Sequence, residues 1–344
     1  MTVLSVGYPS FPVGSWSGGG AEQILHLLES RLVESGVRSF VIAARGSCVR
    51  GTLIETSTCE GLQTEAARKE AQAEHREAIN RVLETQEIDI IHYHGLDFNR
   101  YWAQESTIAQ VATLHLPANW YQPEALGRSS VSLVCVSHIQ AATVQALNAV
   151  SVVPNGIAVE NFRFSSVKSN SLLWLGRLCP EKGVDHALRV ARKLDLALNV
   201  AGPVHPFASH RRYFEEEVKP LLDDQRQYIG PVNLAEKALL LTRARCLLVP
   251  SLAPETSSLV AMEAASSGTP VVAYRSGALP EIVENGVSGF VVESESAMAE
   301  SVLQTHLISS ERCRALAEAR FSAAKMVQSY LDLYKALTFA RPSA

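Results

Sequence analysis

Two short apolar runs, residues 246–251 and 270–274, enclose a stretch whose apolar side chains recur at helical spacing. Each run is almost continuously hydrophobic, which is typical of a strand in a parallel sheet covered by helices on both faces. Neighbouring parallel strands need a crossover connection, so the residues between the runs are predicted to form a helix that begins near Ser258. This strand–helix–strand unit predicts an α/β fold built on a parallel sheet.

Two carboxylates in this unit lie where they can bind a ligand. Glu255 precedes the predicted helix, at the carboxyl end of a strand, and Glu263 lies within the helix among apolar residues. Such a helix is expected to be buried, and a buried carboxylate needs a hydrogen-bond donor, which a ligand hydroxyl would supply. The free N–H groups at the helix start favour phosphate or hydroxyl oxygens. The alternative is that Glu255 is a solvated loop residue and Glu263 an exposed helix residue.

The size and charge of the chain limit what it can be. Its 344 residues exceed what one hydrophobic core usually organises, so we expect two domains. The formal net charge of -4 gives no basic surface for a nucleic acid partner. No apolar run reaches about 18 residues and no cleavable signal is visible, which favours a soluble cytoplasmic protein. No strongly basic amphipathic helix requires a membrane, although membrane association stays open.

The six cysteines form no C-x-x-C pair, and several lie in predicted apolar strands. They are therefore interpreted as buried free thiols. These residues are Cys48, Cys59, Cys135, Cys179, Cys246 and Cys313.

The first half begins with a strand at residues 2–8, a loop that ends in Gly18, Gly19 and Gly20, and a helix over about residues 21–35. A strand, a glycine loop and a helix can hold a phosphate or a sugar, although three glycines can also form a merely flexible turn. The spacing is not G-x-G-x-x-G, and no acid follows about 20 residues later at a strand end. A dinucleotide-binding fingerprint is therefore absent. Later in this half, a long charged helix is predicted to be a solvated surface element.

Two further predicted strands of the first half end in histidines. Residues 88–92 lead to His92 and His94, and residues 111–114 lead to His115. Open α/β sheets bind ligands at the carboxyl ends of their strands. His92 is interpreted as a hydrogen-bonded core residue, whereas His94 and His115 are candidates for substrate hydroxyls. A three-histidine metal site is the alternative.

The second half begins a new alternation of strands and helices. Its first strand, residues 172–175, leads into a turn that contains Gly176, Arg177 and Lys182. The planar fork of an arginine and the movable charge of a lysine can together neutralise a diphosphate without a metal, although they can equally be lone surface cations. If this domain is doubly wound, the two cations share an edge of the sheet with Glu255.

Eight short motifs follow one another along the chain. They are Gly18-Gly19-Gly20-Ala21-Glu22; Asp89-Ile90-Ile91-His92 with His94-Gly95; His115; Pro154-Asn155-Gly156; Gly176-Arg177 with Lys182-Gly183; Glu255 and Glu263 separated by seven residues; Gly268-Thr269-Pro270-Val271-Val272-Ala273; and Glu281 through Gly289. In this order they resemble family 4 glycosyltransferases, and the resemblance covers nearly the whole chain. It implies the GT-B fold, α/β with two Rossmann-like doubly wound parallel-sheet domains facing a central cleft. Residues 1–162 would form the acceptor-side domain, residues 163–321 the donor domain, and residues 322–344 a helix that crosses back.

The resemblance implies a role for each candidate residue. Arg177 and Lys182 would bind the donor diphosphate, and Glu263 the ribose hydroxyls. Glu255, with amides at the following helix start, would bind the transferred sugar, and His115 would approach that sugar from the other domain. The remaining donor-site residues are Gly19, Gly20, Gly176, Pro231, Val232, Thr256, Ser257, Ser258 and Leu259.

The acceptor side is less defined. His94, Trp16 and Trp120 are the acceptor-site candidates, and the side chains of Trp16, Trp102, Trp120 and Tyr121 form either a stacking surface or part of the core. The acceptor is expected to carry a hydroxyl and to be a saccharide, a lipid-linked sugar or a small molecule.

The implied activity is transfer of a hexose from a UDP- or GDP-linked sugar with retention of anomeric configuration, in polysaccharide, glycolipid or secondary-metabolite glycosylation. Neither a cofactor nor a metal is expected, and the chain contains no Asp-x-Asp. It departs from the family where Ser257-Ser258 replaces Phe-Gly, which leaves the sugar open, and where Ile157-Ala158 replaces Val-Asp. The alternatives are a sugar-nucleotide epimerase of the same fold and a non-catalytic nucleotide-sugar-binding subunit.

Overall fold

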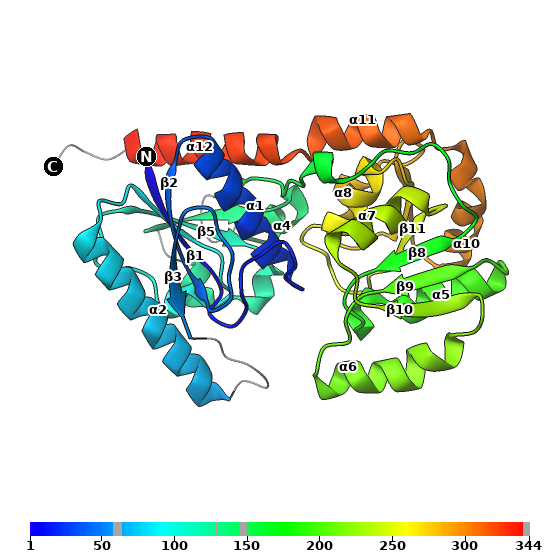
Figure 1. The fold of residues 1–344 in the computed structure, drawn as a ribbon, viewed down its shortest axis with the longest axis horizontal. Coiled ribbons are helices and arrows are strands. Elements are labelled where there is room, and N and C mark those ends of the chain that lie inside the picture. The colour runs from blue at the N-terminus through cyan, green and yellow to red at the C-terminus, as the bar shows by residue number, and fades with distance from the viewer. Residues whose placement is uncertain (58–63, 128–129, 145–149, 340–344) are drawn as a thin grey trace. The chain divides into compact units, whose positions relative to one another are not determined.

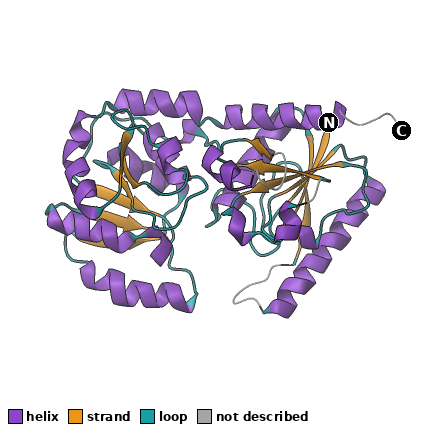
Figure 2. Ribbon diagram, turned by 180° about the vertical axis from the view of Figure 1, so that it is seen from behind, coloured by secondary structure: helices purple, strands orange, loops and turns teal. Residues whose placement is uncertain are grey.

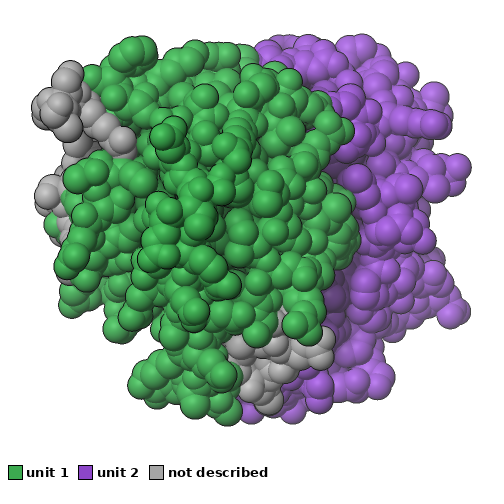
Figure 3. Space-filling view, turned by 60° about the vertical axis from the view of Figure 1, so that its left-hand side comes forward, with its two compact units in different colours: residues 1–156, 323–344 green, residues 157–322 purple. Residues whose placement is uncertain are grey.

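The computed structural model describes residues 1–57, 64–127, 130–144 and 150–339. The chain folds into two compact units (Figure 1, Figure 3). Unit 1 comprises residues 1–156 and 323–344, and unit 2 comprises residues 157–322. The division expected at residue 162 thus lies a few residues inside unit 2, and the helix expected to cross back is part of unit 1. The chain therefore passes between the units twice.

Unit 1 contains a seven-stranded sheet in which all neighbouring strands are parallel. Its order is β3-β2-β1-β4-β5-β6-β7, so the order reverses between β1 and β4. The strands are β1 (Thr2–Val6), β2 (Arg38–Ala44), β3 (Thr52–Thr56), β4 (Ile90–Tyr93), β5 (Ala109–Leu114), β6 (Val131–Cys135) and β7 (Val150–Val152). Strand β3 was not predicted from the sequence, because this edge strand is half-exposed and mixes polar and apolar residues.

The helices of unit 1 are α1 (Gly20–Glu34), α2 (Glu65–Thr85), α3 (Pro123–Leu126), α4 (His138–Val144) and α12 (Ala323–Phe339). Helix α2 is the charged helix expected from the sequence, but one face of it is buried through residues such as His75 and Ile79. Helix α12 packs against α1. It places the fully buried rings of Tyr330 and Tyr334 in the core of unit 1.

Unit 2 contains a six-stranded parallel sheet of order β10-β9-β8-β11-β12-β13. The strands are β8 (Leu172–Leu175), β9 (Leu198–Ala201), β10 (Arg226–Gly230), β11 (Leu247–Val249), β12 (Val271–Tyr274) and β13 (Gly289–Val292). The order again reverses once, between β8 and β11. In both units, helices lie on both sides of the sheet (Figure 2). This confirms two Rossmann-like doubly wound domains.

The helices of unit 2 are α5 (Val184–Lys193), α6 (Ala208–Tyr213), α7 (Leu234–Arg243), α8 (Leu259–Ser266), α9 (Leu279–Ile282), α10 (Glu295–Gln304) and α11 (Ser310–Arg320). Local signals explain several boundaries: a capping box of Asn233 and Glu236 starts α7, and Ser294 caps α10. A π-helical turn, Phe214–Val218, follows α6. Among the described residues, no helix combines the length and the hydrophobicity needed to cross a bilayer.

A single lysine, Lys168, joins the C-terminal ends of α7 and α8. The Nζ atom of Lys168 donates hydrogen bonds to the carbonyl oxygens of Thr242 and Ser267, each at 3.0 Å, and to Oγ1 of Thr269 at 2.8 Å. Thr242 lies in the last turn of α7, and Ser267 follows α8. Burial lowers the pKa of Lys168 to about 8. The carbonyl groups at these helix ends favour its positive charge.

We expect Lys168→Met to lower the free energy of unfolding by about 1–3 kcal/mol, because three acceptors lose a charged donor. Urea denaturation checks this value. The matched control is Lys219→Met, which removes only an exposed ion pair with Glu215 and should change stability little. Equal effects of the two substitutions would contradict a role for Lys168 in joining α7 and α8.

Candidate functional site

The loops that follow β8 and β11 pack against each other at the carboxyl edge of the unit 2 sheet. The backbone N–H of Leu252 donates to the carbonyl oxygen of Glu181 at 2.8 Å. Gly183 adopts a positive φ of 59°, and a Cβ atom there would lie 2.3 Å from the carbonyl oxygen of Pro250. A glycine is therefore needed for this close approach. The strand-order reversal between β8 and β11 brings the two loops together, as the sequence predicts for a ligand site.

An ion pair between Lys182 and Glu255 joins these two loops. Lys182 Nζ lies 2.5 Å from Glu255 Oε1, and Ser251 Oγ donates to the same oxygen at 2.5 Å. The side chains of Lys182 and Glu255 are 29% and 14% exposed. Sequence reasoning expected both residues at this edge but did not expect their direct contact. Each side chain therefore neutralises the charge of the other.

A third loop, after β12, fixes the backbone of Glu255. The N–H of Ala278 donates to the carbonyl oxygen of Glu255 at 2.7 Å. The hydroxyl of Ser276 donates to the carbonyl oxygen of Ala253, also at 2.7 Å. A Cβ atom on Gly277, whose φ is 53°, would lie 2.1 Å from the Glu255 carbonyl oxygen. Three loops thus determine where the Glu255 carboxylate lies.

Glu263 lies in α8 and is buried, as predicted; its side chain is 5% exposed. Lys237 of α7 places its Nζ atom 2.6 Å from Glu263 Oε1. The other oxygen, Oε2, is buried and has no hydrogen-bond partner among the described residues. One oxygen of this carboxylate is thus neutralised and the other can accept a hydrogen bond. Lys237 was not predicted from the sequence, because it lies 26 positions from its partner Glu263. The available signal was the predicted burial of Glu263, since a buried carboxylate needs a cation or a hydrogen-bond donor nearby.

Helix α8 starts as predicted, with Ser258 as the N-cap residue. The Ser258 side chain makes no capping hydrogen bond, although it is buried. The neighbouring Ser257 Oγ is buried and has no partner in the described part of the chain. The first-turn N–H groups, from Leu259 onward, are therefore not covered by the cap side chain, and an external acceptor can use them.

The other predicted donor-side residues differ in their surroundings. Arg177 is half-buried, and its guanidinium forms no ion pair with the described residues. Its charge contributes, after burial, to lowering the pKa values of His205 and His210. Pro231 is exposed just after β10, and Val232 packs against the core together with Leu259 of α8. The remaining two residues, Gly176 and Thr256, lie in the loops after β8 and β11.

Three of the histidines of unit 1, namely His92, His94 and His115, lie side by side. His92 is fully buried, and its ring nitrogens contact the hydroxyls of Thr113 and Tyr334, both at 2.7 Å. This confirms His92 as a hydrogen-bonded core residue. His94 Nδ1 lies 3.0 Å from His115 Nε2, and His94 Nε2 is buried with no described partner. Because both His92 nitrogens contact hydroxyls, the three rings form no metal-binding group in the described part of the chain.

Burial keeps these histidines neutral. It lowers the pKa of His92 to about 3 and that of His115 to about 4. It also holds the pKa of His94 well below its usual range, with smaller contributions from His92 and His115. His94 and His115 can therefore exchange hydrogen bonds with hydroxyl groups but do not titrate near neutral pH.

The four aromatic residues divide between the two interpretations that the sequence left open. Trp16 and Trp120 are 61% and 54% exposed and remain acceptor-site candidates. Trp102 and Tyr121, in contrast, are buried in the core of unit 1, so no four-residue stacking surface exists. Gly19 and Gly20 lie at the start of α1, as the N-cap and the first helical residue.

The cysteines are largely as expected. Cys135, Cys179, Cys246 and Cys313 are buried free thiols. Cys48 is exposed, so the interpretation of that residue as buried was wrong; it follows β2 in a surface loop. Cys59 lies outside the described residues.

Comparison with known proteins relates unit 2 to one family. Residues 159–321 match the family model described as glycosyl transferases group 1. An uncharacterized protein of the cps region of Klebsiella pneumoniae is 31% identical over 174 residues, which cover 48% of this chain and 46% of that protein. A lipopolysaccharide 1,2-N-acetylglucosaminetransferase of Salmonella typhimurium is 25% identical over 219 residues, covering 54% of this chain and 56% of that protein. The matches thus span about half the length of these relatives.

Solved structures share the fold over nearly the whole chain. A glycosyltransferase of avilamycin A biosynthesis, AviGT4, aligns with a TM-score of 0.77 and 23% identity, covering 99% of both chains. Anabaena HepE in complex with UDP and glucose aligns with a TM-score of 0.76 and 16% identity, covering 98% of this chain and 100% of that one. These likenesses confirm the GT-B fold.

We expect Lys237→Met to lower the free energy of unfolding by about 3–5 kcal/mol, because the buried Glu263 carboxylate loses its cation. Combining it with Glu263→Leu should recover most of that loss, since no unpaired charge then remains. Chemical denaturation of the two single variants and the double variant measures the coupling. Additive losses would show that the two side chains do not depend on each other.

The histidine cluster predicts acid sensitivity. The pKa of His92 falls from 6.5 to about 3 on folding, so between these values the unfolded chain binds a proton that the folded chain does not. The contribution of neutral, buried His92 to the free energy of unfolding is therefore complete above about pH 6.5. It declines as the pH falls, by at most about 1.4 kcal/mol per pH unit. His92→Gln, which keeps hydrogen-bonding groups but cannot titrate, should give a shallower decline in unfolding experiments between pH 4 and about 6.5. An unchanged slope would rule out His92 as its source.

Proposed function

We propose that this protein is a retaining glycosyltransferase of family 4 that transfers a hexose from a nucleoside-diphosphate sugar to a hydroxyl-bearing acceptor. The observation that carries the proposal is the arrangement at the reversal between β8 and β11. There Lys182 and Glu255 pair across two loops, and α8 follows with the half-paired Glu263. This arrangement lies within the residues that match the glycosyltransferase family model.

The Lys182–Glu255 ion pair would open when the donor binds. A diphosphate carries more negative charge than a single carboxylate, so it would draw the Lys182 ammonium away from Glu255. Glu255 would then accept hydrogen bonds from hydroxyls of the transferred sugar, while its backbone stays fixed by the loop at Gly277. Arg177 would supply the second cation. Binding would thus convert a neutral pair into two ligand contacts.

Glu263 is suited to the ribose hydroxyls. Lys237 neutralises one oxygen at 2.6 Å, and the buried Oε2 lacks a described donor. A ligand hydroxyl donating to Oε2 would remove the cost of a buried unpaired acceptor. Pro231 and Val232 are retained as the candidates to border the base.

The reaction breaks the bond between the anomeric carbon and the β-phosphate oxygen and forms a bond from that carbon to the acceptor oxygen. The proton of the acceptor hydroxyl passes to the departing phosphate on the same face, so configuration is retained and no separate base is required. Negative charge grows on the leaving phosphate, and preorganised cations and amides stabilise it. Arg177, Lys182 and the N–H groups at the start of α8 are the residues proposed for this task, with no metal ion.

In unit 1, His94 and His115 are proposed as hydrogen-bonding partners for substrate hydroxyls, because both are held neutral by burial. The exposed rings of Trp16 and Trp120 are proposed to stack on the acceptor. A saccharide, a lipid-linked sugar and a small molecule all fit such a surface. A cytoplasmic location stays a prediction.

UDP is the first donor nucleotide to test. Structures of HepE in complex with UDP and with UDP-glucose share the fold of this chain, as does GtfA in complex with UDP and GlcNAc. GDP-linked sugars such as GDP-mannose are the second option. Thermal shift against nucleoside diphosphates and their sugars would identify the base. Consumption of the donor without an acceptor would instead favour an epimerase, and binding without turnover a non-catalytic subunit.

We expect Lys182→Ala to reduce turnover at least tenfold, and about a hundredfold if one charge-assisted contact of about 3 kcal/mol is lost. Donor consumption and product formation are measured by chromatography. The control is Lys193→Ala, an exposed lysine at the end of α5 on the same unit, which should retain full activity. Near-normal turnover of Lys182→Ala with an intact fold would remove Lys182 from the mechanism.

A further inference from the structure

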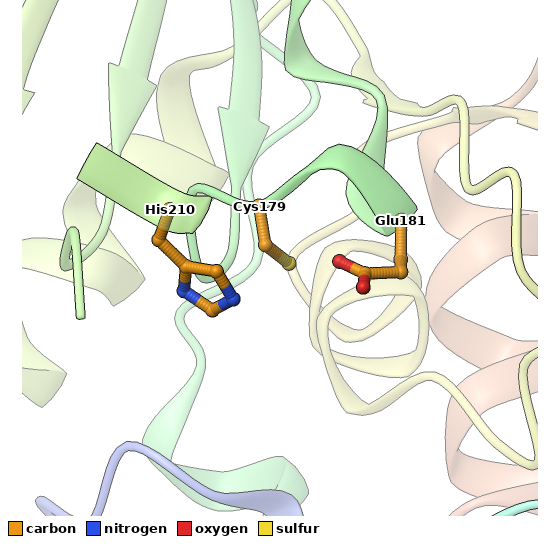
Figure 4. Close-up of side chains that lie close together, drawn as sticks. All are labelled: Cys179, Glu181 and His210. Atoms are coloured by element: carbon orange, nitrogen blue, oxygen red, sulfur yellow. The ribbon is translucent and has the colours of Figure 1, made fainter. Parts of the chain in front are cut away.

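Three side chains with metal-binding atoms meet beside the loop that follows β8. Ligand atoms of Cys179, Glu181 and His210 all lie within 4.8 Å of one another, and among the described residues this is the only group of three such side chains. In Figure 4, the carboxylate of Glu181 and the imidazole of His210 both turn toward the sulfur of Cys179, one from each side. The glycosyltransferase proposal uses none of these side chains.

The backbone holds the first two residues in place. The N–H of Lys182 donates to the carbonyl oxygen of Cys179 at 3.1 Å, which closes the 3-10 turn Pro180–Lys182 that carries Glu181. The carbonyl oxygen of Glu181 in turn accepts the hydrogen bond from Leu252. Cys179 is only 2% exposed, whereas the Glu181 side chain is open to solvent. An ion can therefore enter from the solvent side and reach the buried sulfur.

His210 comes from a separate element, helix α6, where its ring packs against the rings of Phe207 and His205. Neither of its nitrogens hydrogen-bonds to a described residue, and Nδ1 is buried. Nε2 of the neighbouring His205 is also buried with no described partner. An imidazole always has a lone pair or a proton on each nitrogen, so leaving one unpaired in the interior is costly. A bound ion would use a lone pair of the His210 ring that nothing else in the described chain uses.

We propose that Cys179, Glu181 and His210 form a binding site for a divalent transition metal ion, with Zn²⁺ as the best match. Sulfur, imidazole nitrogen and carboxylate oxygen are the three ligand types that Zn²⁺ takes in proteins, whereas Mg²⁺ and Ca²⁺ prefer oxygen ligands. The thiolate and the carboxylate together neutralise the two positive charges. The thiol proton is released to solvent when the Zn–S bond forms.

Three protein ligands leave the fourth tetrahedral position for water or for an oxygen of another molecule. The site shares its loop with Arg177 and Lys182, but it is a separate set of side chains. Its existence does not depend on the proposed transferase activity, because the metal binds to the protein alone. The two proposals can therefore fail independently.

The test uses the untagged, metal-stripped full chain. Zn²⁺ is titrated in competition with a coloured chelator, and Co²⁺ is used as a spectroscopic substitute. We expect about one equivalent to bind, together with a thiolate-to-cobalt charge-transfer band. Bound Zn²⁺ should also raise the melting temperature, because the three ligands come together only in the folded chain.

Variants assign the ligands. Cys179→Ser should abolish the charge-transfer band, and His210→Ala and Glu181→Gln should each weaken Zn²⁺ binding roughly tenfold or more. The matched controls are Cys246→Ser, another buried thiol, and His306→Ala, an exposed histidine; both should bind as the unsubstituted protein does.

Failure to bind Zn²⁺ stoichiometrically, a cobalt spectrum without the thiolate band, or equal losses in Cys246→Ser and Cys179→Ser would each overturn the proposal. If Cys179→Ser does not fold, His210→Ala and Glu181→Gln decide the outcome, because neither side chain belongs to the hydrophobic core. If His210→Ala and Glu181→Gln both bind Zn²⁺ as tightly as the unsubstituted protein does, the proposed metal site is wrong.

Discussion

The reversal of strand order between β8 and β11 determines where Lys182 and Glu255 meet. At the other pairs of neighbouring strands in a doubly wound sheet, the connections lie on the same face. At the reversal the connections leave to opposite faces, and the two following loops meet without a helix between them. Lys182 and Glu255 come from these two loops. Their ion pair is a direct consequence of topology.

The two carboxylates of the site are paired with lysines, and one carboxylate oxygen has no described hydrogen-bond partner. Lys182 neutralises Glu255, and Lys237 neutralises one oxygen of Glu263, so no isolated charge is buried. The second oxygen of Glu263 lacks a described donor. The Glu263 carboxylate is therefore neutralised through one oxygen and can accept a hydrogen bond from a hydroxyl through the other. Because Lys168 joins the distal ends of α7 and α8, the separation of Lys237 and Glu263 is supported from the other end of the same helices.

The sequence predicts well what depends on neighbours along the chain. The unit at residues 246–274 was recognised because continuous apolar runs and helical spacing are local properties, and the start of α8 at Ser258 follows from them. Glu263 was expected to be buried for the same reason, and this is confirmed. The roles of these residues toward a ligand stay predictions.

The features that could not be predicted from the sequence depend on contacts between segments that are distant along the chain. The ammonium of Lys237 meets Glu263 across two helices, and the Tyr334 hydroxyl meets His92 across 242 positions. Exposure of aromatic rings is also decided by tertiary packing, which is why Trp102 is buried and Trp120 is not. The grouping of Cys179 with His210 has the same origin: the helix that carries His210 folds back beside the turn after β8.

Helix α12 gives the protein an unusual order of assembly. Tyr330 and Tyr334 fill the centre of unit 1, yet they follow all of unit 2 in the sequence. As the chain emerges from the ribosome, the whole of unit 2 is available before unit 1 has its last core residues. Until α12 has been synthesised, His92 and Thr113 lack the hydrogen bonds that they make with Tyr334 and Tyr330. Unit 1, which begins before unit 2 in the sequence, is thus completed after it.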